Sequence, residues 1–146
     1  FVGAIPVEYA ASFSAYSFRY VQLRFYGLVA RETVAAMMQQ MDFLLNIGNA
    51  TNYHLPSKSA EYLLSGKPIV NIATIEEDAF SRFMKDYPLL LRILLPENQA
   101  NRESVAVFSA FLKQQKGKEV EREKRQELGG LYTVEVIAEQ CLKCLR

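Results

Sequence analysis

Short apolar runs alternate along this chain with longer segments in which apolar residues recur every three or four positions. Runs of strand length lie at residues 1–5, 21–26, 42–47, 67–72 and 89–95. The run at 42–47 is typical of a strand buried on both faces of a parallel sheet. The run at 89–95 fits a strand, but a helical turn is an alternative there. Several short strands separated by helices are therefore expected.

Helical spacing fills the segments between these runs. Helices are expected at residues 7–16, 31–40, 57–66, 74–87, 101–112 and 131–146. Pro56 and Ser57 suit a helix start, with Ser57 as the N-cap, and Gly66 followed by Pro68 suits a helix end. Alternating strands and helices predict βαβ units, and so an α/β fold with a Rossmann-like, doubly wound parallel sheet flanked by helices.

Capping residues are also present at two of the later helices. Thr74 and Glu77 form a capping-box pattern for a helix that ends before Pro88. Asn101 can cap the helix that follows it. These capping residues predict where two further helices begin.

The composition changes at residue 113, which divides the chain into two predicted parts. Residues 1–112 are expected to form the Rossmann-like domain, and residues 113–146 a charged helical segment with a C-terminal amphipathic helix. The charged segment has few apolar residues and alternates in sign, as a solvated helix or linker does. Gly129 and Gly130 are expected to break it before the amphipathic helix begins.

Overall charge and composition exclude some classes of function. A net charge of +1 gives no electrostatic basis for binding nucleic acid or an anionic membrane. No apolar run is long enough to be a transmembrane segment, and a cytoplasmic location is expected. Cys141 and Cys144 form a lone C-x-x-C pair without a second pair or nearby histidines, so no metal site is predicted.

Polar residues gather where the strand at 42–47 ends. Gly48 and Asn49 follow that strand directly, and Ser57, Lys58 and Glu61 lie in the first turns of the next helix. Ligands of open parallel sheets bind beyond the carboxyl ends of the strands, where helix N-termini favour anions. An ammonium, a hydroxyl and a carboxylate together suit a nucleoside diphosphate, although Lys58 and Glu61 also fit a simple exposed ion pair.

The order of these motifs resembles the C-terminal half of GT-B glycosyltransferases. The resemblance covers about residues 1–71 and rests on three runs: F-Y-G-L-V at 25–29, M-D-F-L-L-N-I-G-N at 41–49, and P-S-K-S-A-E-Y-L-L-S-G-K-P-I-V at 56–70. In that family this half is a Rossmann-like domain that binds the nucleotide-sugar donor. The resemblance therefore implies a glycosyltransferase that uses no cofactor. Its donor substrate would be a nucleoside diphosphate sugar, with UDP as the expected nucleotide.

The resemblance also assigns roles to individual residues. It places Glu61 at the family's ribose-binding glutamate. It places Gly27 and Leu28 in the loop whose backbone contacts the base. The diphosphate would be lined by Gly48, Asn49, Ser57 and Lys58.

Two departures from the family pattern limit this assignment. Tyr53 stands where many retaining members have a second glutamate that holds the donor sugar. The usual first strand and the basic residues after it are absent, so Phe1 is expected to begin a fragment of a longer protein. An N-terminal acceptor-binding domain would complete the enzyme and provide any peripheral membrane contact. The fragment alone is expected to bind donors weakly and to be inactive.

No catalytic base can be identified, and other functions fit the same architecture. A sugar-nucleotide epimerase would need acid and base groups, for which His54 and Glu61 are the nearby candidates. A non-catalytic flavodoxin-like or receiver-like module is the other alternative. The chain contains no Asp-x-Asp sequence, which argues against a diphosphate held by a metal ion.

Overall fold

The computed structural model describes residue 11 and residues 22–95 and 101–130, and the chain divides into two compact units, residues 1–40 and 41–146. In the first unit, helix α2 (Arg31–Gln40) has the predicted bounds. The predicted strand at 21–26 is wrong, because its described residues, 22–26, form no regular structure. A strand requires a partner for its backbone groups, and the described part of this unit contains no other strand.

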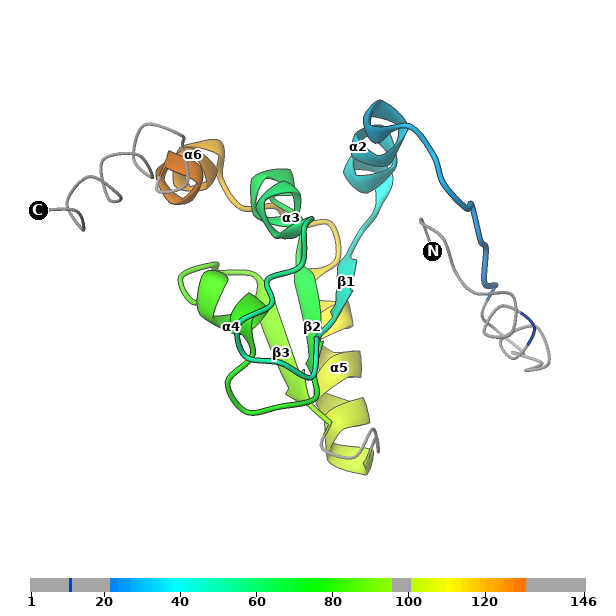
Figure 1. Ribbon diagram of the computed structural model, residues 1–146, viewed down its shortest axis with the longest axis vertical. Coiled ribbons are helices and arrows are strands. Elements are labelled where there is room, and N and C mark those ends of the chain that lie inside the picture. Colours follow the sequence, from blue (N-terminus) through cyan, green and yellow to red (C-terminus); the bar gives the residue numbers. More distant parts are fainter. Residues whose placement is uncertain (1–10, 12–21, 96–100, 131–146) are drawn as a thin grey trace, which may run out of the picture. The chain divides into compact units, whose positions relative to one another are not determined.

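The second unit is built on a parallel sheet of three strands (Figure 1). These are β1 (Leu44–Ile47), β2 (Ile69–Ala73) and β3 (Leu90–Leu94), in the order β1-β2-β3. All three strand predictions in this region are confirmed, including the one at 89–95. The fold is therefore α/β with an open parallel sheet flanked by helices. Strand order follows chain order, so the described strands contain no switch point of a doubly wound sheet.

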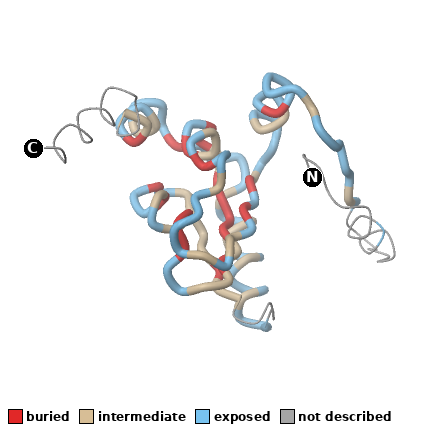
Figure 2. Tube along the Cα trace, viewed as in Figure 1, coloured by how far each residue is buried: buried red, intermediate tan, exposed pale blue. Residues whose placement is uncertain are grey.

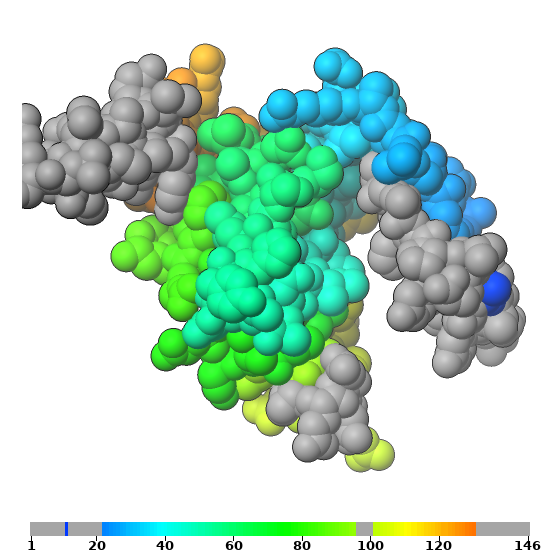
Figure 3. Space-filling model, in the orientation of Figure 1, coloured from blue at the N-terminus to red at the C-terminus, as the bar shows by residue number. Residues whose placement is uncertain are grey.

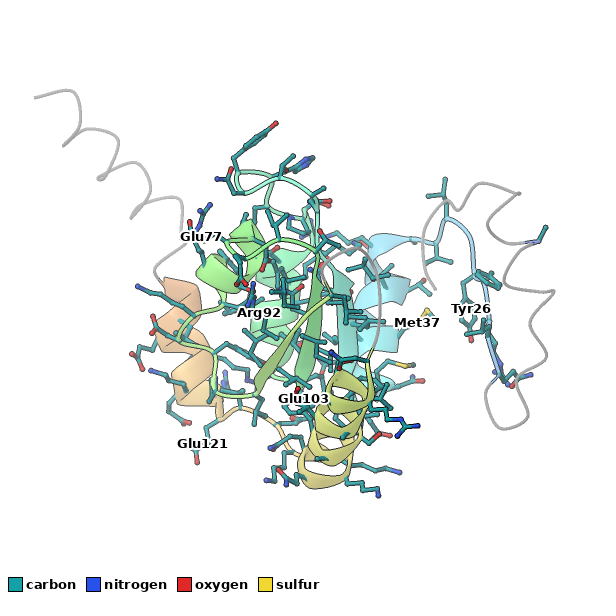
Figure 4. All side chains as sticks on the ribbon, turned by 90° about the horizontal axis from the view of Figure 1, so that it is seen from below. Tyr26, Met37, Glu77, Arg92, Glu103 and Glu121 are labelled. Atoms are coloured by element: carbon teal, nitrogen blue, oxygen red, sulfur yellow. The ribbon has the colours of Figure 1, made fainter. Side chains whose placement is uncertain are left out.

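Helices cover both faces of this sheet, as Figures 1 and 4 show. Helices α3 (Ser59–Ser65) and α4 (Ala79–Phe83) share one face, where the rings of Tyr62 and Phe80 meet edge to face at 6.2 Å. Helix α5 (Arg102–Gln115) lies on the other face and runs alongside β3. Helix α6 (Arg122–Gly130) packs against α3.

Helix boundaries follow local capping, with one correction. Gly66 ends α3 in the left-handed conformation (φ +76°), as predicted, and Asn101 caps α5 in a capping box with Ser104. The predicted capping box of Thr74 and Glu77 is wrong. Instead Asp78 caps α4, because its carboxylate accepts from the backbone N–H of Ser81 at 2.9 Å.

The core is centred on β2, which Figure 2 shows as the most continuously buried strand. Burial of β1 on both faces, in contrast, is wrong: Leu44 is buried, whereas Leu45 is 44% and Ile47 60% exposed. β1 is an edge strand of the described sheet, and α5 packs mainly along β3 on the opposite edge. Near β1, α5 provides the ring of Phe111, which contacts the ring of Phe43 with 6.3 Å between centroids.

Two glycines expected to break the chain instead lie within a helix. Gly129 and Gly130 form the last turn of α6. Gly129 lies against Leu64, where a Cβ would come within 2.7 Å of the leucine Cδ2, so the absence of a side chain permits close packing there. The division predicted at residue 112 falls inside α5, whereas the compact units divide at residue 40. Predicted elements at 1–5, 7–16 and 131–146 lie outside the described residues, apart from residue 11.

Candidate functional site at the carboxyl ends of β1 and β2

The carboxyl ends of β1 and β2 are joined by two hydrogen bonds. The backbone N–H of Gly48 donates to the carbonyl of Ile72 at 2.8 Å, and the Thr74 hydroxyl donates to the carbonyl of Asn49 at 3.4 Å. A Cβ at Gly48 would lie 3.1 Å from the Ile72 carbonyl oxygen. A side chain at position 48 would therefore press on the backbone of β2, so the glycine permits the two strands to end this close together.

The loop after β1, residues 49–55, lies on the face of the molecule that Figure 3 shows. Hydrogen bonds hold it at two points. The side-chain amide of Asn49 donates to the carbonyl of His54 at 3.0 Å. Arg82 of α4 donates to the carbonyl of Asn52. Tyr53 nevertheless projects from this loop with 81% of its surface exposed. The loop is thus held by one hydrogen bond within it and one from α4, while its central side chains face solvent.

The entry to α3 differs from the prediction, because α3 begins at Ser59 and its N-cap is Lys58. Ser57 is exposed and does not cap the helix. A tight turn replaces that cap, since the carbonyl of Pro56 accepts from both the backbone N–H and the hydroxyl of Ser59, at 3.0 and 2.6 Å. With only seven residues, α3 is short, and its dipole adds little to the charges of Lys58 and Glu61 at its start.

Lys58 and Glu61 form an ion pair at the start of α3. Their Nζ and Oε2 atoms are 3.2 Å apart, and their side chains are 45% and 24% exposed. The structure therefore brings together two of the residues predicted to bind a diphosphate and a ribose. The pair fits the alternative of an ordinary exposed ion pair equally well, and such a pair contributes under about 1 kcal/mol.

The inner face of α3 rests on the sheet through few residues. Leu63 is buried, but Ala60 is exposed and Leu64 is 53% exposed. Tyr62 completes the contact, because its hydroxyl donates to the carbonyl of Leu45 at 3.2 Å. Burial raises the pKa of this hydroxyl, and the nearby charge of Glu61 adds to the effect. Tyr62 therefore stays a neutral hydrogen-bond donor that fixes α3 on β1.

A polar row crosses the sheet beneath this site, and the sequence analysis missed it. Asn46, Asn71 and Arg92 are neighbours in register on β1, β2 and β3. The amide of Asn46 donates to Oδ1 of Asn71 at 2.7 Å, and Asn71 is fully buried. The available signal was a single polar residue inside each apolar run, in LLNI, IVNI and LLRIL.

The polar row continues into the loop after β2. The amide of Asn71 donates to Asp78 at 3.1 Å and to the Ser81 hydroxyl at 2.9 Å. The guanidinium of Arg92, which Figure 4 labels, lies 3.5 Å from the Asp78 carboxylate and donates to the carbonyls of Ile75 and Glu76. Buried polar contacts with β2 and β3 therefore hold the loop that carries Thr74.

Asp78 is ionised within this network. Burial alone would raise its pKa, but hydrogen bonds from Ser81 and Asn71 and the adjacent guanidinium of Arg92 outweigh burial and lower it. A charged carboxylate that is 1% exposed requires such partners. The network thus supports the strand ends and is not itself open to a ligand.

Two predicted site residues belong to the first unit, and a depression lies elsewhere in the second unit. Gly27 (φ +64°) and Leu28, which is 84% exposed, belong to the first unit. An open depression of about 220 Å³ lies between β3 and the start of α5, where Ile93, Asn101 and Val107 are part of its lining. This depression does not include the predicted residues at the end of β1.

Within residues 22–95 and 101–130, no three histidine, cysteine, aspartate or glutamate side chains are grouped as metal ligands would be. Among the helices that the structure describes, none has the length and apolar character needed to cross a bilayer. Comparison with family models, curated proteins and solved structures found no match to this chain.

Proposed function

We propose that this chain is a nucleotide-sugar-binding domain of a glycosyltransferase, in which the end of β1 and the start of α3 bind the nucleoside diphosphate. The observation that carries the proposal is the Lys58–Glu61 pair at the carboxyl edge of a parallel sheet. This edge is where α/β proteins of this architecture bind their ligands. The motif order shared with GT-B glycosyltransferases supplies the specific class.

The two side chains contact different parts of such a ligand. The Lys58 ammonium contacts the diphosphate and stabilises the charge that develops as this group leaves. The Glu61 carboxylate accepts hydrogen bonds from the ribose hydroxyls. Their mutual ion pair is exposed enough to exchange partners at small cost. The acceptor would be held by an N-terminal domain of the same protein.

Nucleotide titration of the chain tests this proposal directly. UDP, GDP and dTDP would be added to ¹⁵N-labelled protein, and amide shifts would be followed in the wild type and in Glu61→Gln. Glu127→Gln is a matched control, because Lys124 and Glu127 form an exposed pair of the same spacing at 2.9 Å on α6. We expect one nucleotide to shift the amides of residues 48–61, with loss of this effect in Glu61→Gln only.

The alternatives predict different outcomes of the same titration. Binding of flavin mononucleotide or acetyl phosphate without any nucleotide binding would favour a flavodoxin-like or receiver-like module. Nucleotide binding that Glu127→Gln and Glu61→Gln weaken equally would contradict the assignment of Glu61 to the ribose. An epimerase would convert the sugar of its own UDP-sugar without an acceptor, which product analysis detects.

A further inference from the structure

The C-terminal strap, defined as residues 117–130, is fastened to the far end of α3. Helix α6 forms most of it, and Figure 1 shows α6 beside α3. The backbone N–H of Val120 donates to the carbonyl of Gly66 at 2.8 Å. Arg125 donates to the carbonyls of Leu64 and Ser65, each at 3.3 Å. The strap therefore satisfies carbonyls at the end of α3 that the helix itself leaves unpaired.

Packing and charge add to these hydrogen bonds. Val120 and Leu128 of the strap are 5% and 6% exposed, so they are buried as fully as core residues. The side chain of Leu64 is accommodated by Gly129. Lys67, just beyond α3, pairs with Glu119 at 2.5 Å, and hydrogen bonding to Lys67 lowers the pKa of this carboxyl. The strap is thus docked through backbone, apolar and ionic contacts together.

Helix α3 depends on such support because it is short. Seven residues are far below the roughly 12–15 that an isolated helix needs in water. Only Ser59, Leu63 and Ser65 of α3 are buried, and its outer residues Ala60 and Leu64 are exposed. The contacts with the sheet through Leu63 and Tyr62 hold its middle, whereas the strap holds its end. Removal of the strap would free the last turn and unwind the helix toward Lys58.

We propose that the C-terminal strap is a conformational latch, which keeps α3 helical when docked and releases it when undocked. The latch sets whether Lys58 and Glu61 are presented together, and its effect on ligand binding rests on the proposed function. The strap follows α5 on the opposite face of the sheet through the turn at Gly117, so it can detach without separating the strands. The latch couples the C-terminal segment to the strand-end site through α3.

Hydrogen exchange of the whole chain tests the latch without any ligand. Arg125→Met removes the hydrogen bonds to the end of α3, and Leu128→Ser removes the buried anchor. Arg122→Met is the control, because Arg122 is exposed on the same helix. We expect amides of residues 59–65 to exchange about tenfold faster in the first two variants, with β2 amides and the control unchanged. Unchanged protection of α3, or equal loss in α3 and β2, would overturn the latch.

The same variants then separate the latch from the proposed function. Titration with UDP should give several-fold weaker binding in Arg125→Met and Leu128→Ser than in the wild type and Arg122→Met. If the wild type does not bind any nucleotide but α3 loses protection as expected, the latch stands and the proposed function fails. If the α3 amides of the variants lose protection but the variants bind UDP with full affinity, the strap does not control the binding site.

Discussion

The side-chain amide of Asn71 donates a hydrogen bond to the carboxylate of Asp78 over 3.1 Å, in the buried centre of the second unit. This bond joins the middle of β2 to the N-cap of α4, seven residues later. It holds the loop between them in one conformation, in which the Thr74 hydroxyl donates to the carbonyl of Asn49. The geometry of the strand ends therefore depends on side chains that no ligand can reach.

Replacement of Asn71 tests how much this buried row contributes. Asn71→Leu keeps the number and branching of the side-chain heavy atoms but leaves Asn46 without its acceptor and Asp78 without one donor. We expect the free energy of unfolding to fall by about 3 kcal/mol, since each unpaired buried group costs roughly 1–3 kcal/mol. Urea denaturation with an unchanged m-value would measure this loss. Asn46→Leu leaves only the Asn71 carbonyl oxygen unpaired, so it should cost less, and an equal cost would contradict the central role of Asn71.

The lowered pKa of Asp78 predicts how stability depends on pH. The folded state holds this pKa below its ordinary value of 3.8, so the unfolded chain binds the proton more readily. The stabilisation is complete well above pH 4 and is lost as pH falls through the folded pKa. Asp78→Asn keeps a good N-cap but removes the charge.

Urea midpoints between pH 7 and pH 2.5 provide the measurement for Asp78. The wild type should lose more stability than Asp78→Asn over this range. Glu119 also has a lowered pKa, from its contact with Lys67, and therefore contributes with the same sign. Glu119→Gln is thus the necessary comparison, and parallel curves for wild type and Asp78→Asn would contradict the assignment to Asp78.

The sequence predicted the βαβ alternation correctly in the second unit because its apolar runs are bounded by strong local signals. Gly66 with Pro68 ends α3, and Asn101 starts α5, as their residue types require. The strand at 21–26 failed because strand formation depends on a partner, which local composition does not reveal. The start of α4 failed because two acceptable caps were close in sequence and tertiary contacts favoured Asp78.

The candidate site was predicted less completely than the fold. Lys58 and Glu61 are three positions apart, and residues at this spacing are neighbours on a helix, so their contact could be predicted. The buried row could not be found the same way, because Asn46, Asn71 and Arg92 are neighbours only after the strands are placed in register. Contacts of the C-terminal strap with α3 join residues about sixty positions apart, and no local pattern encodes such a pairing.

Two isoleucines on neighbouring strands provide a matched test of burial. Ile69 is fully buried on β2, whereas Ile47 on β1 is 60% exposed. We expect Ile69→Ala to cost about 2–5 kcal/mol and Ile47→Ala less than about 1 kcal/mol. Thermal and urea unfolding of both variants would measure the difference. An equally large cost at Ile47 would show that its side chain is covered in solution.

Gly48 connects the packing of the strand ends with the proposed site. Gly48→Ala would place a Cβ 3.1 Å from the Ile72 carbonyl oxygen, which belongs to the rigid backbone of β2. We expect the free energy of unfolding to fall by about 1–2 kcal/mol and the amide shifts of residues 72–74 to change, because the Ile72 carbonyl must move by a few tenths of an ångström.

Gly130→Ala is the control for Gly48→Ala, since a Cβ at Gly130 meets no atom within 4 Å and alanine suits a helix better than glycine. The control should not lower stability. If Gly48→Ala kept full stability but abolished nucleotide binding, Gly48 would act by contacting the ligand and not by joining β1 to β2. If stability and nucleotide binding fell together, close packing of the two strand ends would be what forms the site.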